Sequence, residues 1–149
     1  MRRRWMSGLM VVGVLAGLAA CASMEPQTPP SLYKRLGGRE GIAGVVDDFT
    51  ANMAADPRVN ARFKSLQPGD LQRFRSNLAD QICDATGGPC SYLGKDMKKA
   101  HEGMRITEAE WNATVENLVK ALDKHKVDAA SKQELLGALG PMKKDIVGQ

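Results

Sequence analysis

From residue 32 onward, apolar residues recur with the period of an α-helix, and no stretch shows a convincing strand pattern. A first long helix is predicted over the face from Ile42 to Met53, and Asp56-Pro57 ends it. A second is predicted from Leu71 to Ile82, and Gly87-Gly88-Pro89 stops it. The two apolar faces consist of Ile42, Val45, Val46, Phe49 and Met53, and of Leu71, Phe74, Leu78 and Ile82.

Two further helices are predicted from capping-box patterns, in which a Ser or Thr is followed three residues later by Glu. Thr107–Glu110 opens the third helix, and Ser131–Glu134 opens the fourth, which Pro141 should bend. Their inner faces are Trp111, Val115, Leu118, Val119 and Leu122, and Leu135, Leu136, Leu139, Met142 and Ile146. Four principal helices can enclose one core, so the predicted fold class is all-α.

The first twenty residues are typical of a targeting signal. Arg2, Arg3 and Arg4 precede an uncharged segment, Gly8–Ala20, which is shorter than the roughly 20 residues of a membrane span. Small residues then lead to Cys21, an order that resembles a bacterial lipobox, in which the cysteine is lipidated and becomes the mature N-terminus. A plain secretory signal and a residual anchor helix are the alternatives.

This pattern divides the chain into a lipoprotein signal peptide (1–20), a lipidated N-terminus with an extended tether (21–31) and a folded domain (32–149). The tether contains three prolines and no apolar periodicity. Because Ala22 follows the cysteine in place of aspartate, we expect attachment to the outer membrane of a bacterial envelope, facing the periplasm.

The net charge of +4 does not indicate a nucleic-acid partner. Three of the 21 basic residues lie among the first twenty positions, which hold none of the 17 acidic residues. The folded part is therefore nearly neutral, and no basic face for nucleic acid is implied.

Four segments together resemble a group 1 truncated haemoglobin over residues 32–147. They are the Gly-Gly element Leu32–Gly38, the helix segment Ile42–Phe49, the turn Gly87–Pro89 and the histidine segment Met97–Thr107. The resemblance implies a two-over-two helical sandwich around haem b, with a proximal histidine as the iron ligand and a loop in place of most of the preceding helix.

His101 is the candidate iron ligand. It is one of two histidines, and it lies four residues after Met97, so both can share one face of a short helix. A neutral imidazole is a good ligand for haem iron, and its second ring nitrogen requires an acceptor, for which we expect a backbone carbonyl. His125 lies in a polar link between helices and is expected to be solvated.

The resemblance also assigns residues around the haem. Tyr92 and Met97 are expected to line the pocket, and Lys95 is expected to meet a haem propionate, although a solvated lysine is the simpler interpretation. Trp111 is assigned to the core rather than to the haem. The haem contacts implied are Phe49, Phe63, Phe74, Leu78, Tyr92, Lys95, Met97 and His101.

The distal side departs from the family's best-studied pattern. Thr50 stands where that pattern has a tyrosine, and Phe74 and Leu78 stand where it often has glutamines. The side chain of Asn77 or Gln81 could instead turn into the distal pocket and donate a hydrogen bond. Loss of a hydrogen bond worth about 1–3 kcal/mol would speed O₂ release roughly 5- to 150-fold. The sequence therefore predicts an apolar distal pocket that favours CO, NO or weakly held O₂.

Cys83 and Cys90 close a short loop after the second helix. An oxidising compartment permits a disulfide there, and the alternative is one buried cysteine and one exposed thiol. Neither thiol has a plausible base partner, so a cysteine nucleophile is not expected.

The predicted function is binding of a diatomic gas (O₂, NO or CO) at haem iron, in oxygen binding or transport or in NO detoxification. NO dioxygenation or weak peroxidase activity would need an external electron donor, because the sequence carries no flavin or nicotinamide motif. One alternative is a non-haem, globin-shaped envelope lipoprotein with an interaction or structural role. Another is a haem carrier.

Overall fold

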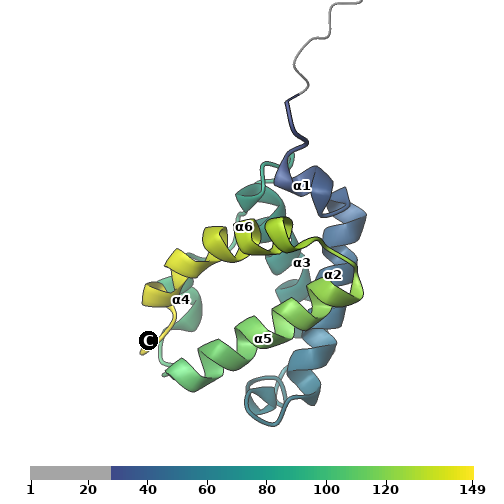
Figure 1. Ribbon diagram of the computed structural model, residues 1–149. Helices are drawn as coiled ribbons and strands as arrows, with labels where there is room; N and C mark the ends of the chain where they lie inside the picture. The colour runs from purple at the N-terminus through teal and green to yellow at the C-terminus, as the bar shows by residue number, and fades with distance from the viewer. Residues whose placement is uncertain (1–27) are drawn as a thin grey trace, which may run out of the picture.

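The computed structural model describes residues 28–149 and contains six α-helices and two short 3₁₀ helices in that part of the chain (Figure 1). The predicted signal peptide, Cys21 and most of the predicted tether lie outside these residues. The long helices are α2 (Gly38–Ala55), α3 (Pro68–Ala85), α5 (Glu108–Lys124) and α6 (Ala129–Leu139). The short ones are α1 (Leu32–Arg35), η1 (Asn60–Arg62), α4 (Met97–His101) and η2 (Gly140–Asp145).

A tight glycine turn joins α1 to α2. Gly37 has a φ of +85°, a left-handed conformation that glycine adopts without strain. The chain then folds back so closely that a Cβ on Gly41 would lie 2.1 Å from the carbonyl oxygen of Leu36. Helix α2 ends as predicted, because Asp56 takes the extended backbone that a following proline imposes.

Capping boxes open both α3 and α5. The box at Thr107 is the predicted one, and its hydroxyl accepts from the Glu110 N–H while the Glu110 carboxylate accepts from the Thr107 N–H. The box at the start of α3 pairs Gln67 with Asp70, and Pro68 occupies the first turn, where no N–H is needed. Each box satisfies N–H groups that have no partner within the helix.

The predicted start of the fourth helix is wrong by three residues. Helix α6 begins at Ala129, and its N-cap is Asp128, whose carboxylate accepts the Ser131 N–H at 2.9 Å and the Ser131 hydroxyl at 2.6 Å. Aspartate is as good an N-cap as serine, so the earlier residue takes the role. Near Pro141, the α-helix ends at Leu139 and continues as the 3₁₀ helix η2 instead of bending.

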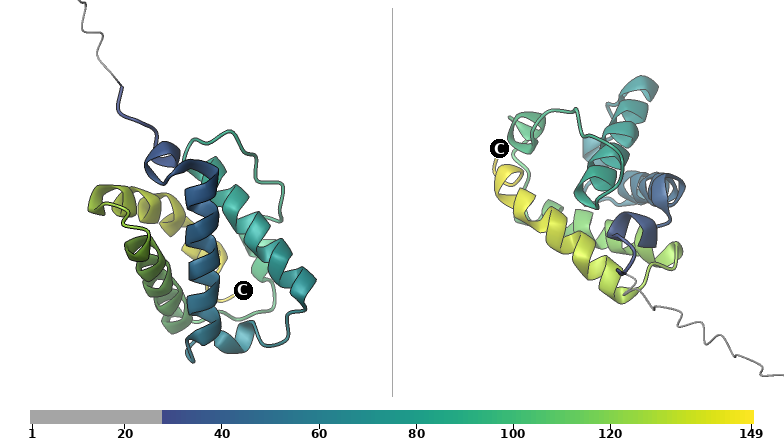
Figure 2. Two further views of the ribbon diagram at one scale, coloured as in Figure 1. Left: turned by 90° about the vertical axis from the view of Figure 1, so that its right-hand side faces the viewer. Right: turned by 90° about the horizontal axis from the view of Figure 1, so that it is seen from above.

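The helices form the two-over-two sandwich that the sequence predicts. Helix α2 packs against α3 on one side and against α5 on the other, while α1 contacts α6. Figure 2 shows the α2–α3 pair lying across the α5–α6 pair, with α4 and the C-terminus at one edge. Among the described residues, the only strand-like pairing is a single parallel bridge between Ile106 and Val147.

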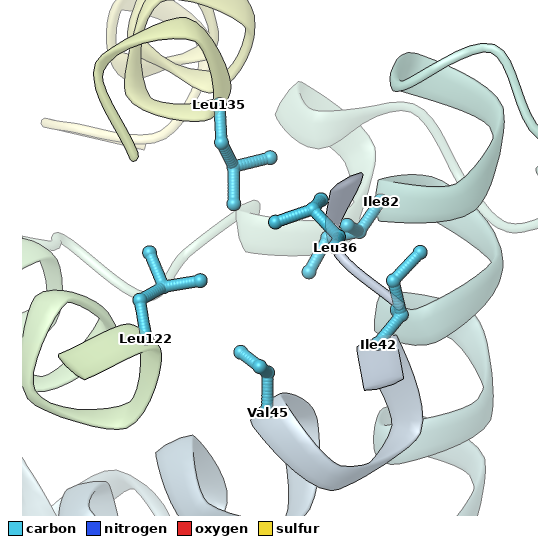
Figure 3. Close-up of a pocket in the computed structure, with 6 residues that line it drawn as sticks. All are labelled: Leu36, Ile42, Val45, Ile82, Leu122 and Leu135. Carbon is cyan, nitrogen blue, oxygen red and sulfur yellow. The ribbon is translucent and has the colours of Figure 1, made fainter. Parts of the chain in front are cut away.

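The core lies where these helices meet. Apolar side chains from the C-cap of α1 and from α2, α3, α5 and α6 converge on one point and leave no space that a water molecule could fill (Figure 3). This dry centre is therefore packing and not a ligand site. Its residues are Leu36, Ile42, Val45, Ile82, Leu122 and Leu135. No helix within residues 28–149 is both long and apolar enough to cross a membrane.

Candidate ligand site around His101

The imidazole of His101 is held in one tautomer. Its Nδ1 lies 2.8 Å from the carbonyl oxygen of Met97, one turn earlier in α4. Because a carbonyl only accepts, Nδ1 carries the proton, so the tautomer of the uncharged ring has its lone pair on Nε2. Within the described chain, Nε2 has no hydrogen-bond partner. This arrangement is the one expected for a neutral histidine that binds a metal through Nε2.

Polar contacts position the short helix α4. The Asp96 carboxylate caps its start by accepting the Lys99 N–H at 2.9 Å. After the helix, the Met104 N–H donates to the His101 carbonyl at 3.0 Å, and the Arg62 guanidinium donates to the Met104 carbonyl at 2.8 Å. None of the five residues of α4 is buried.

The C-terminal residues tie down the loop that follows α4. The Gly148 N–H donates to the Ile106 carbonyl at 2.9 Å, and the Arg105 N–H donates to the Gln149 carbonyl. Arg105 takes a left-handed backbone with a φ of +51°, which is uncommon for a residue with a side chain. The loop between α4 and α5 is therefore fixed from both sides.

Thr50, the residue predicted for the distal pocket, is buried in α2. Its side chain is 1% exposed, and its hydroxyl donates to the Val46 carbonyl of the same helix at 2.7 Å. A threonine hydroxyl has one proton, so this bond leaves none for a bound ligand. Phe49, beside it, is also buried.

Many apolar side chains of the described residues are only half-buried. Phe63 and Phe74 meet edge-to-face with ring centroids 5.6 Å apart. Trp111, expected in the core, lies outside the buried cluster, because the core face of α5 is formed instead by residues such as Leu118 and Leu122. The half-buried apolar set is Phe63, Phe74, Leu78, Trp111, Val115, Leu136, Leu139, Met142 and Ile146.

Gln81 links the half-buried apolar set to α4. Its Nε2 lies 3.3 Å from the sulfur of Met97 and 3.5 Å from the sulfur of Met142, so one amide spans α3, α4 and η2. Sequence reasoning named Gln81 only as a possible distal donor and assigned Met142 to a helix face. The structure turns the amide of Gln81 toward two thioethers, which are weak acceptors, whereas Asn77 is exposed.

These residues fit a haem group. Haem needs one nitrogen ligand with a free lone pair and apolar side chains on both sides of a flat ring. His101 supplies the nitrogen, and the half-buried apolar set supplies side chains that a large apolar ligand would cover. No group of three or more His, Cys, Asp and Glu within residues 28–149 could hold a metal ion by itself.

Tyr92 and Lys95 lie in the loop before α4. The Tyr92 hydroxyl donates to the Lys95 carbonyl at 2.6 Å, and its N–H donates to the Asp84 carboxylate at 2.9 Å. Burial, with a smaller contribution from Asp96, raises the pKa of Tyr92. Tyr92 therefore shapes this loop, while the Lys95 side chain is exposed and its contact with a propionate stays a prediction.

A disulfide joins Cys83 to Cys90, the first of the two alternatives that the sequence left open. It ties the last turn of α3 to the loop that leads to α4. Next to it, Gly88 packs so closely that a Cβ there would lie 2.5 Å from the Cys83 sulfur. The start of this loop is therefore fixed covalently, seven residues before Met97.

His125 is exposed, as predicted, and it also contacts α2. Its Nε2 lies 2.9 Å from an Asp48 carboxylate oxygen, and Gly44 lies directly against its ring. Lys124 pairs with the same carboxylate at 2.7 Å, and hydrogen bonds from Lys124 first and then from His125 lower the pKa of Asp48. His125, the C-cap of α5, thus connects the end of α5 to Asp48 and Gly44 of α2.

A two-over-two helical sandwich with a histidine whose Nδ1 is tied to a backbone carbonyl is the arrangement of a globin. The sequence matches the bacterial-like globin family over residues 31–147. The chain belongs to this family, and its relatives are group 1 truncated haemoglobins.

Three relatives illustrate the match. The group 1 truncated hemoglobin GlbN of Mycolicibacterium paratuberculosis is 30% identical over 125 residues, which are 84% of this chain and 90% of the relative. The truncated hemoglobin of Tetrahymena pyriformis in its Fe(III) form superposes with a TM-score of 0.75 at 30% identity, covering 80% of this chain and all of the relative. The Synechococcus 2/2 hemoglobin with covalently attached heme gives 0.72 at 27% identity, covering 79% and 98%.

Proposed function

We propose that this globin binds haem b through His101 and holds a diatomic gas on the opposite face of the haem, in an apolar pocket. The observation that carries the proposal is the His101 side chain, whose Nδ1 proton is committed to the Met97 carbonyl while Nε2 has no partner within the described chain. Family membership supports the cofactor, since the solved relatives include Fe(III) and cyanomet forms.

The chain's own residues have separable roles in this proposal. Haem iron held by one histidine supplies an open coordination position for O₂, NO or CO. The Met97 carbonyl fixes the orientation and basicity of the imidazole. Phe49, Phe63, Phe74 and Leu78 exclude water, and Met97 and Tyr92 complete the proximal side.

The distal wall offers no strong donor. Thr50 donates to Val46, and Phe74 and Leu78 carry no polar groups. Bound O₂ carries partial negative charge and is retained by donors, so an apolar wall favours CO, NO or rapidly released O₂. Stopped-flow measurement of O₂ dissociation tests this point, and release as slow as in a relative with a distal tyrosine would contradict it.

The test of haem ligation is the absorption spectrum of the purified protein reconstituted with haem, in ferric, ferrous and CO-bound forms. We expect a stoichiometric Soret band near 400–430 nm, the usual region for protein-bound haem. His101→Ala should abolish or shift this band. His125→Ala is the matched control, because it removes the other histidine at the Asp48 contact.

The same spectra decide between this function and its alternatives. A band that is indifferent to His101→Ala would overturn the assignment of the ligand. Absence of a band from folded protein, with its helices verified by circular dichroism, would favour a non-haem structural lipoprotein. Rapid transfer of bound haem to an acceptor globin would favour a haem carrier.

Turnover chemistry at this site would draw electrons from outside. We propose that NO dioxygenation or peroxidase activity, where it occurs, depends on a separate electron-donor protein. The sequence carries no flavin or nicotinamide motif, which supports this dependence. NADH alone should leave the ferric protein unreduced, and direct reduction by NADH would contradict the proposal.

We also propose that lipid on Cys21 attaches the chain to the outer membrane, with the globin in the periplasm. The support is the order of basic residues, apolar run, small residues and cysteine, followed by a tether that ends where α1 begins. Metabolic labelling with an alkyne fatty acid should mark the wild-type chain in the outer-membrane fraction and not Cys21→Ala. A processed but unlabelled wild-type chain would indicate a plain secretory signal.

A further inference from the structure

The loop between α3 and α4 carries the most exposed large apolar side chain among the described residues. Leu93 is 92% exposed, and Leu66, at 37%, is the only other exposed large apolar side chain within residues 28–149. A single exposed leucine is ordinary on a protein surface, so its meaning depends on how the chain holds it and on what lies beside it.

The residues on either side of Leu93 fix the direction in which it points. The Tyr92 N–H donates to the Asp84 carboxylate at 2.9 Å, and the Tyr92 hydroxyl donates to the Lys95 carbonyl at 2.6 Å. Gly94 permits this close turn, because a Cβ there would lie 2.4 Å from the phenol of Tyr92. Tyr92 is therefore turned back onto its own loop, while the next side chain, Leu93, is held out in solvent.

The same end of the molecule receives the chain that leads from Cys21. In α1, the Tyr33 N–H donates to the carbonyl of Thr86, the C-cap of α3, at 3.0 Å. Asp84, which accepts from the loop, lies in the last turn of α3. The start of α1 and Leu93 therefore lie at one end of α3, and Figure 2 shows the loop leaving α3 beside α1.

The chain before α1 is long enough for this end of the molecule to lie on a bilayer. Ten residues lead from Cys21 to Ser31, the N-cap of α1, and they reach at most about 35 Å at full extension. Leu66 lies just before α3, at the opposite end of that helix, whose 18 residues are about 27 Å long. Lipid on Cys21 would therefore hold the Leu93 end near the bilayer and leave the Leu66 end farther from it.

We propose that Leu93 enters the surface of the bilayer to which Cys21 is attached, so that the C-terminal end of α3 faces the membrane. This inference rests on the proposed lipid attachment at Cys21. Transfer of a leucine side chain from water into apolar surroundings is favourable, and an attached chain needs only a weak contact because docking is then intramolecular. Lys34, exposed in the same short helix as Tyr33, adds a charge that anionic headgroups attract.

The experiment anchors the protein through Cys21 and measures amide hydrogen exchange by mass spectrometry. The chain from Cys21 onward is made without the first twenty residues and is coupled to a maleimide lipid in vesicles of phosphatidylethanolamine and phosphatidylglycerol. Cys83 and Cys90 do not react, because they form the disulfide. At short labelling times, the amides of residues 91–96 should exchange more slowly in the vesicle-bound chain than in the same chain capped with N-ethylmaleimide.

Substitutions at Leu93 separate contact with lipid from a general effect of anchoring. Leu93→Ala should reduce the protection about tenfold, because it removes most of the apolar surface that enters the lipid. Leu93→Trp should keep or increase the protection, since tryptophan favours the membrane interface. Leu66→Ala is the matched control, because it makes the same change at the other end of α3, and it should leave the protection unchanged.

Equal exchange on vesicles and in solution would overturn the proposal, as would protection of the segment around Leu66 in place of residues 91–96. Protection that is already present in the capped chain would indicate contact with a second copy and would also overturn it. Maleimide coupling anchors Cys21 whether or not a cell lipidates it. An unlabelled Cys21 in cells therefore counts against the lipid attachment, whereas missing protection on vesicles counts against the loop contact, so the two failures are distinguishable.

Discussion

Helices α2 and α4 are held in place by different forces. Six residues of α2 are buried, whereas α4 has none. Helix α2 packs against both α3 and α5, while the main packing neighbour of α4 among the described elements is η2. Hydrophobic burial thus fixes α2, whereas caps and other polar contacts fix α4 and its histidine.

The difference shows how a fold with a stable core can keep the helix that carries its candidate ligand, α4, less firmly packed. Buried apolar contacts give most of the free energy of folding, so α2 and its partners should remain ordered without a ligand. Short helices such as α4 gain little from burial and depend on caps and neighbouring loops. A cofactor bound between the half-buried apolar set and His101 would therefore stabilise the α4 side most.

The largest effect should come from opening the core on the α2 side. Leu122 is fully buried and points toward Leu36, Val45 and Leu135 (Figure 3). Leu122→Ala removes these contacts and leaves a cavity, which should lower the free energy of unfolding by about 2–5 kcal/mol. Urea denaturation followed by circular dichroism measures this change.

Leu93→Ala is the control for this prediction, because it has the same chemistry at a side chain that is 92% exposed. It should change the free energy of unfolding by less than about 0.5 kcal/mol. Equal losses in the two variants would mean that burial does not distinguish these regions.

The next effect concerns the α4 side, where the disulfide fixes the preceding loop. Replacing both Cys83 and Cys90 by Ala should lower the free energy of unfolding by about 2–3 kcal/mol, the chain-entropy value for so short a loop. Haem loss to an acceptor globin should also become faster, because the loop leads to His101. A reductant should reproduce both changes in the wild type and have no effect on the double variant.

The long helices and their caps were predictable from sequence because they depend on local periodicity and hydrogen bonds. The buried face of α5 was harder to predict, because its apolar side chains cover more of the helix than the core contacts. The core takes Leu118 and Leu122, which leaves Trp111 and Val115 half-buried. The contacts of Gln81 with Met97 and Met142 join segments distant in sequence, and no local signal indicates them.

The sequence also carries no indication of the contact between Asn117 of α5 and Asp56 at the end of α2. This contact makes the junction of the two helices sensitive to acid. Asn117 is 2% exposed and donates to the Asp56 carboxylate at 2.7 Å. Hydrogen bonds from Arg58 and then from Asn117 hold the pKa of Asp56 well below its usual range. A depressed pKa contributes stability above the ordinary Asp value near 3.9, and this stability is lost as pH falls below it.

Asp56→Asn should therefore flatten the dependence of stability on pH between about 4 and 2, the range below the ordinary Asp pKa. The measurement is the urea midpoint across that range for the wild type and the variant. Asp123→Asn is a comparable control, since Asp123 is more than half exposed and pairs with Lys132 at the surface. An unchanged slope in Asp56→Asn would show that other carboxylates govern the acid response.

The smallest effect is expected at Thr50, which the family resemblance assigns to the distal pocket. Because its hydroxyl proton is committed to the Val46 carbonyl, Thr50→Val should change O₂ dissociation by no more than about twofold, or under 0.5 kcal/mol. Leu78→Gln, nearly equal in size, places a donor where the family often has one and should slow release by up to the 5- to 150-fold of a distal hydrogen bond. A tenfold change in Thr50→Val would instead mean that the hydroxyl leaves its helix to reach the gas. The buried side chains of α2 would then change conformation as readily as the exposed helix α4.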